Sequence, residues 1–187
     1  MATDPNAGTT IFDAIRKRRV TRSFTAQPIE RALLQQVVEA ARWAPSAGNR
    51  RIHIFVVVDD TALIRKVRLM SPGMLGVPAA LIVICTDWRR AELAGVKREE
   101  LNTWIDVGTA TQNMLLTAHE LGLGAGPVTS FSRSGLQVLL HLPDYVTPEL
   151  MICLGYAAPT IRVMRAGAST LVKVAELTFW NRYDQQG

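Results

Sequence analysis

The sequence contains little cysteine and has no long hydrophobic run. Its two cysteines, Cys85 and Cys153, each lie inside an apolar run that favours a buried free thiol over a disulfide or a CxxC redox pair. No run approaches the roughly 18 apolar residues that a membrane-spanning helix needs, and the N-terminus has no signal-peptide core. These absences predict a cytoplasmic protein with no membrane partner.

Several common catalytic motifs are also missing. The GLGAG stretch at 122–126 lacks the third glycine of a dinucleotide fingerprint, and it precedes a predicted strand instead of following one. The sequence has no Walker A loop and no GxSxG elbow. The three histidines, His53, His119 and His141, are scattered and lack metal-ligand spacing with the cysteines. We therefore expect no metal site and no nucleophilic side chain.

Positive charge is concentrated near the N-terminus. The chain has a formal charge of +5, and much of the excess comes from five cations at positions 16, 17, 18, 19 and 22. Arginine suits phosphate because its guanidinium offers planar, paired donors and stays charged. A solvated helix end favoured by the helix dipole is an alternative, and so is a nucleic-acid patch. The cluster lacks interleaved aromatic residues, so we expect no nucleic-acid partner.

The order of apolar patterns predicts an α+β fold with a central mixed sheet sandwiched by helices. Nearly all-apolar strands between helices indicate a sheet covered on both faces. We expect a flexible arm over residues 1–9 and a single domain over 10–187, with an extended tail from Ala158. The first predicted helix begins at Ile11 and runs into the basic cluster, and the other predicted helices are 29–44, 62–70, 98–121 and 136–142. The predicted strands are 52–60, 79–87, 125–131 and 149–157.

Local signals refine two of these helices. The aspartate that ends the first predicted strand is the expected N-cap of the helix at 62–70. Gly122 suits the C′ position of the long helix. Gly108, near the middle of that helix, predicts the close approach of another backbone. The predicted apolar side of the long helix contains Leu101, Trp104, Ile105, Leu115 and Ala118.

Four segments, in the correct order, resemble the nitroreductase family. RRVTRSF at 18–24 matches the family's RRSxRxF signature, and the segment APSAGNRRIHIF at 44–55 is similar to its APSSxNxQPWxF motif. GTATQNMLLTAHELGLGAGPVTSF resembles the central helix and flavin-facing strand, and LGYA followed by TFWNRY looks like the C-terminal section. The resemblance runs from about residue 11 to 183. It implies a dimeric, nitroreductase-like FMN-binding fold.

The resemblance also implies roles for individual residues. It places Arg18, Arg19 and Val20 at the flavin, with the two arginines on the phosphate side, and Arg22 near N1 and the C2 carbonyl. The other cofactor-binding residues that it implies are Pro45, Ser46, Ala47 and Asn49 from the opposite subunit, Thr129 and Ser130 near flavin N5, and Arg162 and Arg165 near the phosphate.

The sequence departs from the family pattern at three places. Val20 replaces a serine and removes a hydroxyl donor to the flavin. Arg51-Ile52-His53 stands where the motif has Gln-Pro-Trp, and Ser130 stands where glycine is common. These departures do not argue against flavin binding, but they affect which substrate is expected.

The implied function is an FMN-dependent oxidoreductase that takes hydride from NADH or NADPH. No catalytic side chain is expected, because flavin N5 carries the chemistry and the protein supplies binding, orientation and electrostatics. No separate nicotinamide-binding motif is present, so donor and acceptor are expected to use one flavin face in turn. The acceptors would be nitroaromatics, quinones or similar small molecules. The alternatives are a flavin-binding protein without turnover, or flavin fragmentation, dehalogenation or enone reduction.

Overall fold

A computed structural model describes residues 10–98, 100–159 and 173–183. The predicted arm at residues 1–9 lies outside these ranges, and so do Arg162 and Arg165. No helix within the described ranges is long and apolar enough to cross a membrane.

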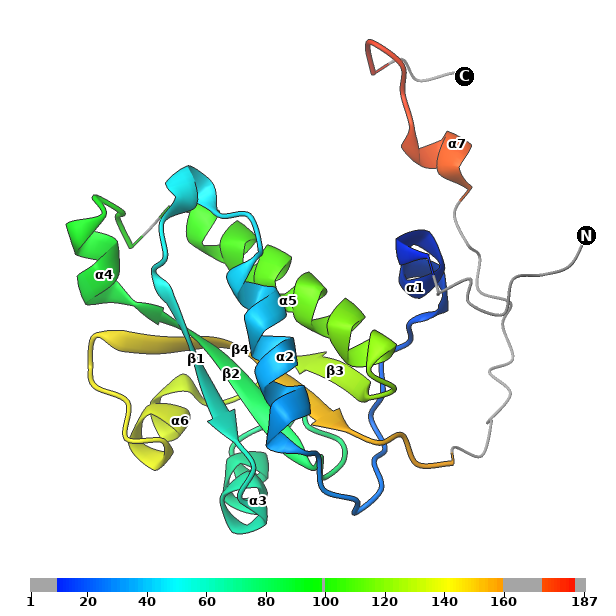
Figure 1. Ribbon diagram of the computed structural model, residues 1–187. Helices are drawn as coiled ribbons and strands as arrows, with labels where there is room; N and C mark the ends of the chain where they lie inside the picture. Colours follow the sequence, from blue (N-terminus) through cyan, green and yellow to red (C-terminus); the bar gives the residue numbers. More distant parts are fainter. Residues whose placement is uncertain (1–9, 99, 160–172, 184–187) are drawn as a thin grey trace, which may run out of the picture.

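A four-stranded antiparallel sheet forms the centre of the fold (Figure 1). Its strands lie in the order β1-β2-β4-β3. Their bounds are His53–Val58 (β1), Ala80–Asp87 (β2), Gly124–Val128 (β3) and Val146–Gly155 (β4). All four were predicted, and the α+β class is confirmed. Parallel pairing within the described ranges is limited to an isolated bridge between Val20 and Ala125.

Seven α-helices and one short 3-10 turn are present in the described ranges. The helices are α1 (Ile11–Lys17), α2 (Arg31–Arg42), α3 (Thr61–Leu69), α4 (Trp88–Leu93), α5 (Asn102–Glu120), α6 (Arg133–Leu139) and α7 (Val174–Leu177), and the turn is η1 (Ala47–Asn49). Asp60 caps α3, because its carboxylate accepts a hydrogen bond from the backbone N–H of Leu63 at 2.6 Å. Helix α4 was not predicted, since six residues after a strand carry too short a periodic pattern. Helix α7 corrects the prediction of a wholly extended tail.

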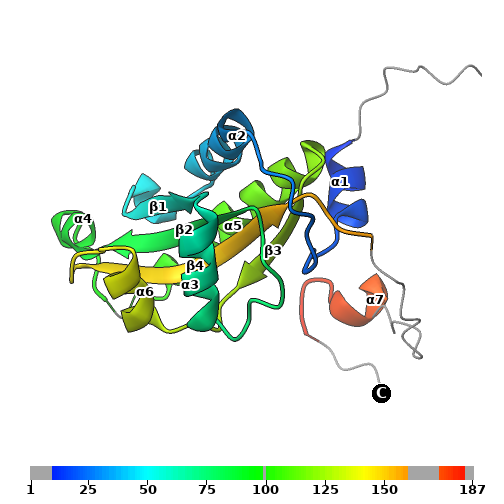
Figure 2. The ribbon, with the colours of Figure 1, turned by 90° about the horizontal axis from the view of Figure 1, so that it is seen from below.

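Helices cover both faces of the sheet, as Figure 2 shows from below. Helices α2 and α5 pack on one face, where Val37 and Met114 meet Ile82 and Ile152. Helices α3 and α6 pack on the other face. The alternating side chains of β2 and β4 fill both cores, which explains why these strands are apolar throughout. Cys153 is buried as a free thiol, and burial raises its pKa to about 12.

The predicted apolar side of α5 is only partly buried. Its buried face contains Leu115 and Ala118, but Leu101, Trp104 and Ile105 are exposed. A Cβ atom added to Gly108 would meet nothing within 4 Å, so no backbone among the described residues makes the close approach that was predicted there. Gly122 does occupy the expected C′ position, with a φ of 73°.

Candidate functional site

The segment that follows α1 joins the exposed edge of the sheet. Val20 forms a bridge with Ala125, and the backbone N–H of Thr21 donates to the carbonyl of Ala125 at 2.9 Å. Phe24 forms a second, antiparallel bridge with Ala157, just after β4. The basic cluster is therefore held beside β3 by backbone hydrogen bonds.

Two glycines permit this close pairing. A Cβ atom at Gly126 would lie 2.5 Å from the carbonyl oxygen of Thr21, and one at Gly76 would lie 2.5 Å from the carbonyl oxygen of Arg22. No side chain fits at either distance, so the segment lies between β3 and the 73–76 loop. The cleft between them has a volume of about 40 Å³.

Arg18 lies at the start of this segment, and part of its guanidinium is buried without hydrogen-bond partners among the described residues. It forms the C-cap of α1, and its side chain is half-buried. Its Nε and Nη1 atoms are buried, and neither has a hydrogen-bond partner among the described residues. Buried guanidinium nitrogens rarely lack acceptors, so the site suits an added anion.

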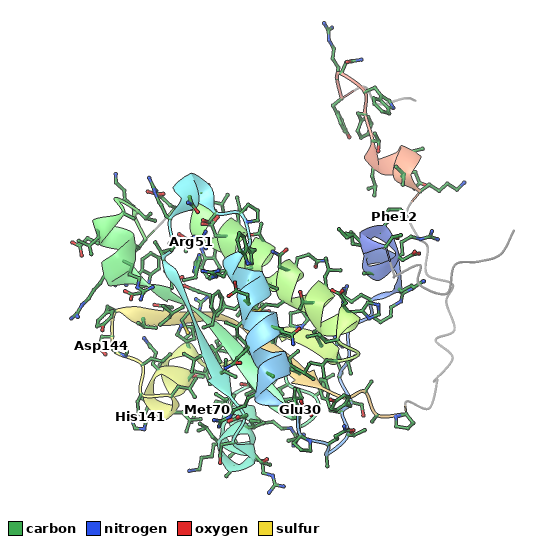
Figure 3. All side chains as sticks on the ribbon, viewed as in Figure 1. Phe12, Glu30, Arg51, Met70, His141 and Asp144 are labelled. Carbon is green, nitrogen blue, oxygen red and sulfur yellow. The ribbon has the colours of Figure 1, made fainter. Side chains whose placement is uncertain are left out.

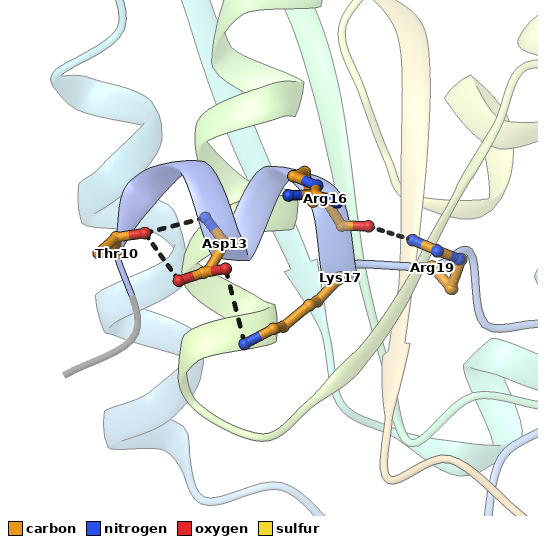
Figure 4. Close-up of polar contacts among 5 residues, drawn as sticks. All are labelled: Thr10, Asp13, Arg16, Lys17 and Arg19. Atoms are coloured by element: carbon orange, nitrogen blue, oxygen red, sulfur yellow. Dashed lines mark hydrogen bonds and ion pairs between the residues drawn. The ribbon is translucent and has the colours of Figure 1, made fainter. Parts of the chain in front are cut away.

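The side chain of Arg19 turns back toward the end of α1. Its Nη1 atom donates to the carbonyl oxygens of Arg16 and Arg18, as Figure 4 shows for Arg16. The same view shows the other end of the helix, where the Thr10 hydroxyl accepts a hydrogen bond from the N–H of Asp13 at 3.1 Å. Arg19 is exposed and would have to change its rotamer to reach a ligand beside Arg18.

Thr129 and Ser130 follow β3 directly, and both are exposed. The carbonyl of Ser130 accepts a hydrogen bond from the N–H of Gly73 at 3.1 Å, which fixes the turn. Val20 and Arg22 are likewise exposed beside this strand. The structure therefore brings Arg18, Val20, Arg22 and the strand end to one edge of the sheet.

An ion pair between an exposed arginine and a buried carboxylate links α6 to β4. Glu149 of β4 is only 4% exposed, and Arg133 at the start of α6 contacts its carboxylate at 3.2 Å. The Arg133 guanidinium also lies 5.1 Å from the centre of the Trp104 ring. Burial raises the pKa of Glu149 above its usual value, and the opposing effects of Arg133 and the Thr86 hydroxyl only reduce the shift.

The predicted loop from Pro45 to Asn49 is anchored on α5. The N–H of Ala47 donates to the Asp106 carboxylate at 3.0 Å, and the Thr109 hydroxyl donates to the Pro45 carbonyl at 2.9 Å. Asn49 is exposed, and its φ of 53° lies in the left-handed region that asparagine tolerates. The hydroxyl oxygen of Ser46 is buried without a partner among the described residues.

This loop does not meet the basic cluster within the chain. In Figure 1, η1 lies at the N-terminal end of α5, whereas α1 lies beside its C-terminal end. The stretch of α5 from Asp106 to Glu120 spans roughly 20 Å at 1.5 Å per residue. The two halves of the predicted site are therefore separated by most of the length of α5.

Sequence reasoning missed several residues that shape the site. Gly76 and Gly126 allow the backbone pairing, and Asp106 holds the loop. Asp106 could have been noticed, because it is a charged residue between apolar positions of a core helix. The role of the glycines depends on the segment opposite each of them, which only the folded chain reveals.

The comparisons with known proteins point to one family. A sequence model of the nitroreductase family matches residues 15–73 and 68–156. A protein of Methanothermobacter thermautotrophicus, provisionally named an NADH dehydrogenase/NAD(P)H nitroreductase, is 31% identical over 155 residues, which cover 79% of this chain and 78% of that protein. The FMN reductase [NAD(P)H] of Bacillus subtilis is 27% identical over 164 residues, covering 79% of this chain and 66% of the reductase.

A comparison of structures points to the same family of folds. The crystal structure of a nitroreductase family protein from Clostridium difficile superimposes with a TM-score of 0.76, covering 91% of this chain and 97% of that protein. The two sequences are 24% identical, so this likeness concerns the fold alone.

The raised pKa of Glu149 predicts a pH-dependent stability. A carboxylate whose pKa is higher in the folded state stabilises the fold below its unfolded pKa of about 4.5, and this contribution is lost as the pH rises through the folded value. Urea unfolding between pH 4 and 8 should therefore show wild type losing stability with rising pH relative to Glu149→Gln. Asp144→Asn, at an exposed loop position, is the matched control and should follow wild type. Parallel curves for wild type and Glu149→Gln would contradict the assignment.

Proposed function

This chain belongs to the nitroreductase family, and we propose that it acts as a homodimeric, FMN-dependent oxidoreductase that passes hydride from NADH or NADPH to small acceptors. We take nitroaromatics and quinones as the acceptor class and the cytoplasm as the compartment. Residues 10–187 would form a single FMN-binding domain. When bound, FMN supplies hydride transfer at its N5 atom.

The observation that carries this proposal is the unsatisfied guanidinium of Arg18. Its guanidinium has two buried nitrogens without partners among the described residues, beside a sheet edge to which the neighbouring backbone is fixed. A phosphate supplies the oxygen acceptors that this geometry lacks. The residues present therefore fit an anionic cofactor at the edge of the sheet.

The remaining residues extend the site along β3. Arg22 is exposed beside the same strand and would place a positive charge near the flavin N1 and C2 carbonyl region. Thr129 and Ser130 would present backbone N–H groups at the strand end. Their backbone is held by the contact between Ser130 and Gly73.

A second copy of the chain would complete the site. The cleft of about 40 Å³ beside β3 is much smaller than the roughly 300–1,000 Å³ typical of ligand pockets, so a flavin must lie largely on an open surface of one chain. We propose that the loop from Pro45 to Asn49 of the partner covers it. The exposed apolar residues fit this arrangement, since large exposed patches mark interaction surfaces. These include Phe12 of α1, Trp104 and Ile105 of α5, and Trp180 and Tyr183 after α7.

Arg18→Ala should weaken FMN binding. Loss of a charge-assisted hydrogen bond costs about 1.5–3 kcal/mol, so the Kd should rise roughly 10- to 150-fold. Fluorescence titration of flavin-stripped protein with FMN measures the effect. Arg16→Ala is the matched control, because Arg16 is exposed and its side chain lies over the Phe12 ring. Equal affinities for the two variants would place the phosphate elsewhere, and failure of wild type to bind FMN would refute the functional proposal.

A mixed dimer tests whether the loop acts in trans. When one chain carries Arg18→Ala and its partner carries Asn49→Ala, one composite site is damaged twice and the other is intact. FMN titration should then show half of the sites with wild-type affinity. If the loop acts within its own chain, each site carries one lesion and no wild-type site remains. A monomeric protein loaded with FMN at micromolar concentration would also contradict the arrangement.

Steady-state kinetics tests the shared-face mechanism. Donor and acceptor should take turns at one site, because the sequence has no dinucleotide fingerprint for a separate nicotinamide domain. Double-reciprocal plots of NAD(P)H against a quinone should be parallel, with each substrate inhibiting competitively at high concentration. Intersecting lines would indicate a second pocket. If NAD(P)H does not bleach the flavin absorbance, the result would favour a flavin-binding protein without turnover.

A further inference from the structure

A cavity of about 500 Å³ lies beside the Pro45–Asn49 loop, away from the basic cluster. It is formed by the end of α2, the loop, the start of β1 and the first half of α5. Its apolar lining includes Ala41, Trp43, Ala44, Pro45, Phe55 and Ala110, and its polar lining includes Ser46, Arg51, His53 and Asp106. A cavity of this size accommodates a small organic molecule. Figure 3 labels Arg51 next to η1 and the N-terminal end of α5.

Three polar groups of this cavity have unused hydrogen-bonding capacity. Ser46 Oγ and His53 Nε2 are buried, and neither has a partner among the described residues. Arg51 uses Nη1 to reach the carbonyl of Arg42 and Nε to reach Asn49 Oδ1 at 3.3 Å, which leaves Nη2 available. Buried polar atoms without partners in a folded protein call for a water or a ligand.

The cavity coincides with a departure of this chain from the family motif. His53 occupies the position where the motif has tryptophan, and Arg51 occupies the glutamine position. Trp43, His53 and Phe55 all line the cavity, and imidazole is smaller than the indole of the motif. Burial lowers the pKa of His53, so the ring is neutral at physiological pH and contributes a polar atom without a charge.

Most of the charges around the cavity already compensate one another. Arg42 pairs with Glu39 at 2.7 Å, Arg90 with Asp87 at 3.3 Å, and Arg50 with Glu100 at 3.7 Å. Among the cations that line the cavity in the described part of the chain, Arg51 alone has no carboxylate partner.

A buried aspartate restricts the charge of a ligand further. Asp106 is 6% exposed and accepts the N–H of Ala47. Its negative charge disfavours a second anion deep in the cavity. A ligand with one negative charge, placed at the exposed Arg51, fits both constraints, whereas a phosphate dianion does not.

We propose that this cavity binds a small aromatic monocarboxylate. The ring would pack against the aromatic side chains that line the cavity, Trp43 and Phe55, and the carboxylate would accept hydrogen bonds from Arg51. A polar substituent on the ring would satisfy His53 Nε2. Arg51 and His53, which carry this proposal, are not among the residues assigned to FMN, whereas Pro45 and Ser46 belong to the loop that we propose covers the partner's flavin.

Ligand-detected NMR titration of the purified protein with benzoate tests the proposal, and FMN absorbance of the same sample reports the flavin content separately. Benzoate should bind saturably, with one site per chain. Arg51→Gln should weaken it at least roughly tenfold through loss of a charge-assisted contact. His53→Trp should weaken binding, because the larger indole takes up part of the cavity beside Phe55. Arg65→Gln, at an exposed position of α3, is the matched control and should bind like wild type.

Two further ligands test the charge and shape that the cavity requires. Benzamide has the same shape as benzoate without the charge and should bind at least roughly tenfold more weakly. Inorganic phosphate should not compete. Absence of saturable benzoate binding to wild type, or equal binding by Arg51→Gln and His53→Trp with wild-type melting temperatures, would overturn the proposal. Binding that requires FMN and is unchanged by His53→Trp would place benzoate over the flavin and would overturn it as well.

Discussion

The backbone pairing of residues 20–25 with the sheet edge determines where most of the candidate site lies. Thr21 donates to the carbonyl of Ala125, and Thr25 donates to the carbonyl of Tyr156, both at 2.9 Å. An unpaired strand edge is a row of exposed donors and acceptors, and this segment covers part of it. Because the backbone is fixed at these points, Arg18 and Arg22 stay beside β3, which ends at Val128.

The separation of the two site halves follows from the length of α5. The loop from Pro45 to Asn49 is tied to the first half of that helix through Asp106, whereas the basic cluster lies beyond its other end. Helix α1 has no buried residue, and α5 exposes Trp104 and Ile105. Exposed apolar surfaces of this kind are costly on a monomer. Helix α5 therefore both separates the two halves of the site and offers an apolar surface on which a second chain could pack.

Burial changes the chemistry of several polar groups near these surfaces. Glu149 retains a partner in Arg133, yet its burial outweighs that attraction and raises its pKa. His53 is neutral because of burial, and its Nε2 atom has no partner among the described residues. Such groups are compatible with a stable fold only where an ion pair, a water or a ligand satisfies them.

The strands, two helix ends and the family could all be predicted from the amino-acid order. The all-apolar runs of β2 and β4 predict their burial on both faces, and Asp60 and Gly122 mark helix ends because their local hydrogen bonding and backbone geometry do not depend on distant residues. The motifs also singled out Arg18 and the Pro45–Asn49 loop as candidate site residues. Three features emerge only in the folded chain: the buried face of α5, the distance between the two site halves, and the cavity beside His53 at the motif's tryptophan position. Each of these depends on packing between segments distant in the sequence, which no local pattern encodes.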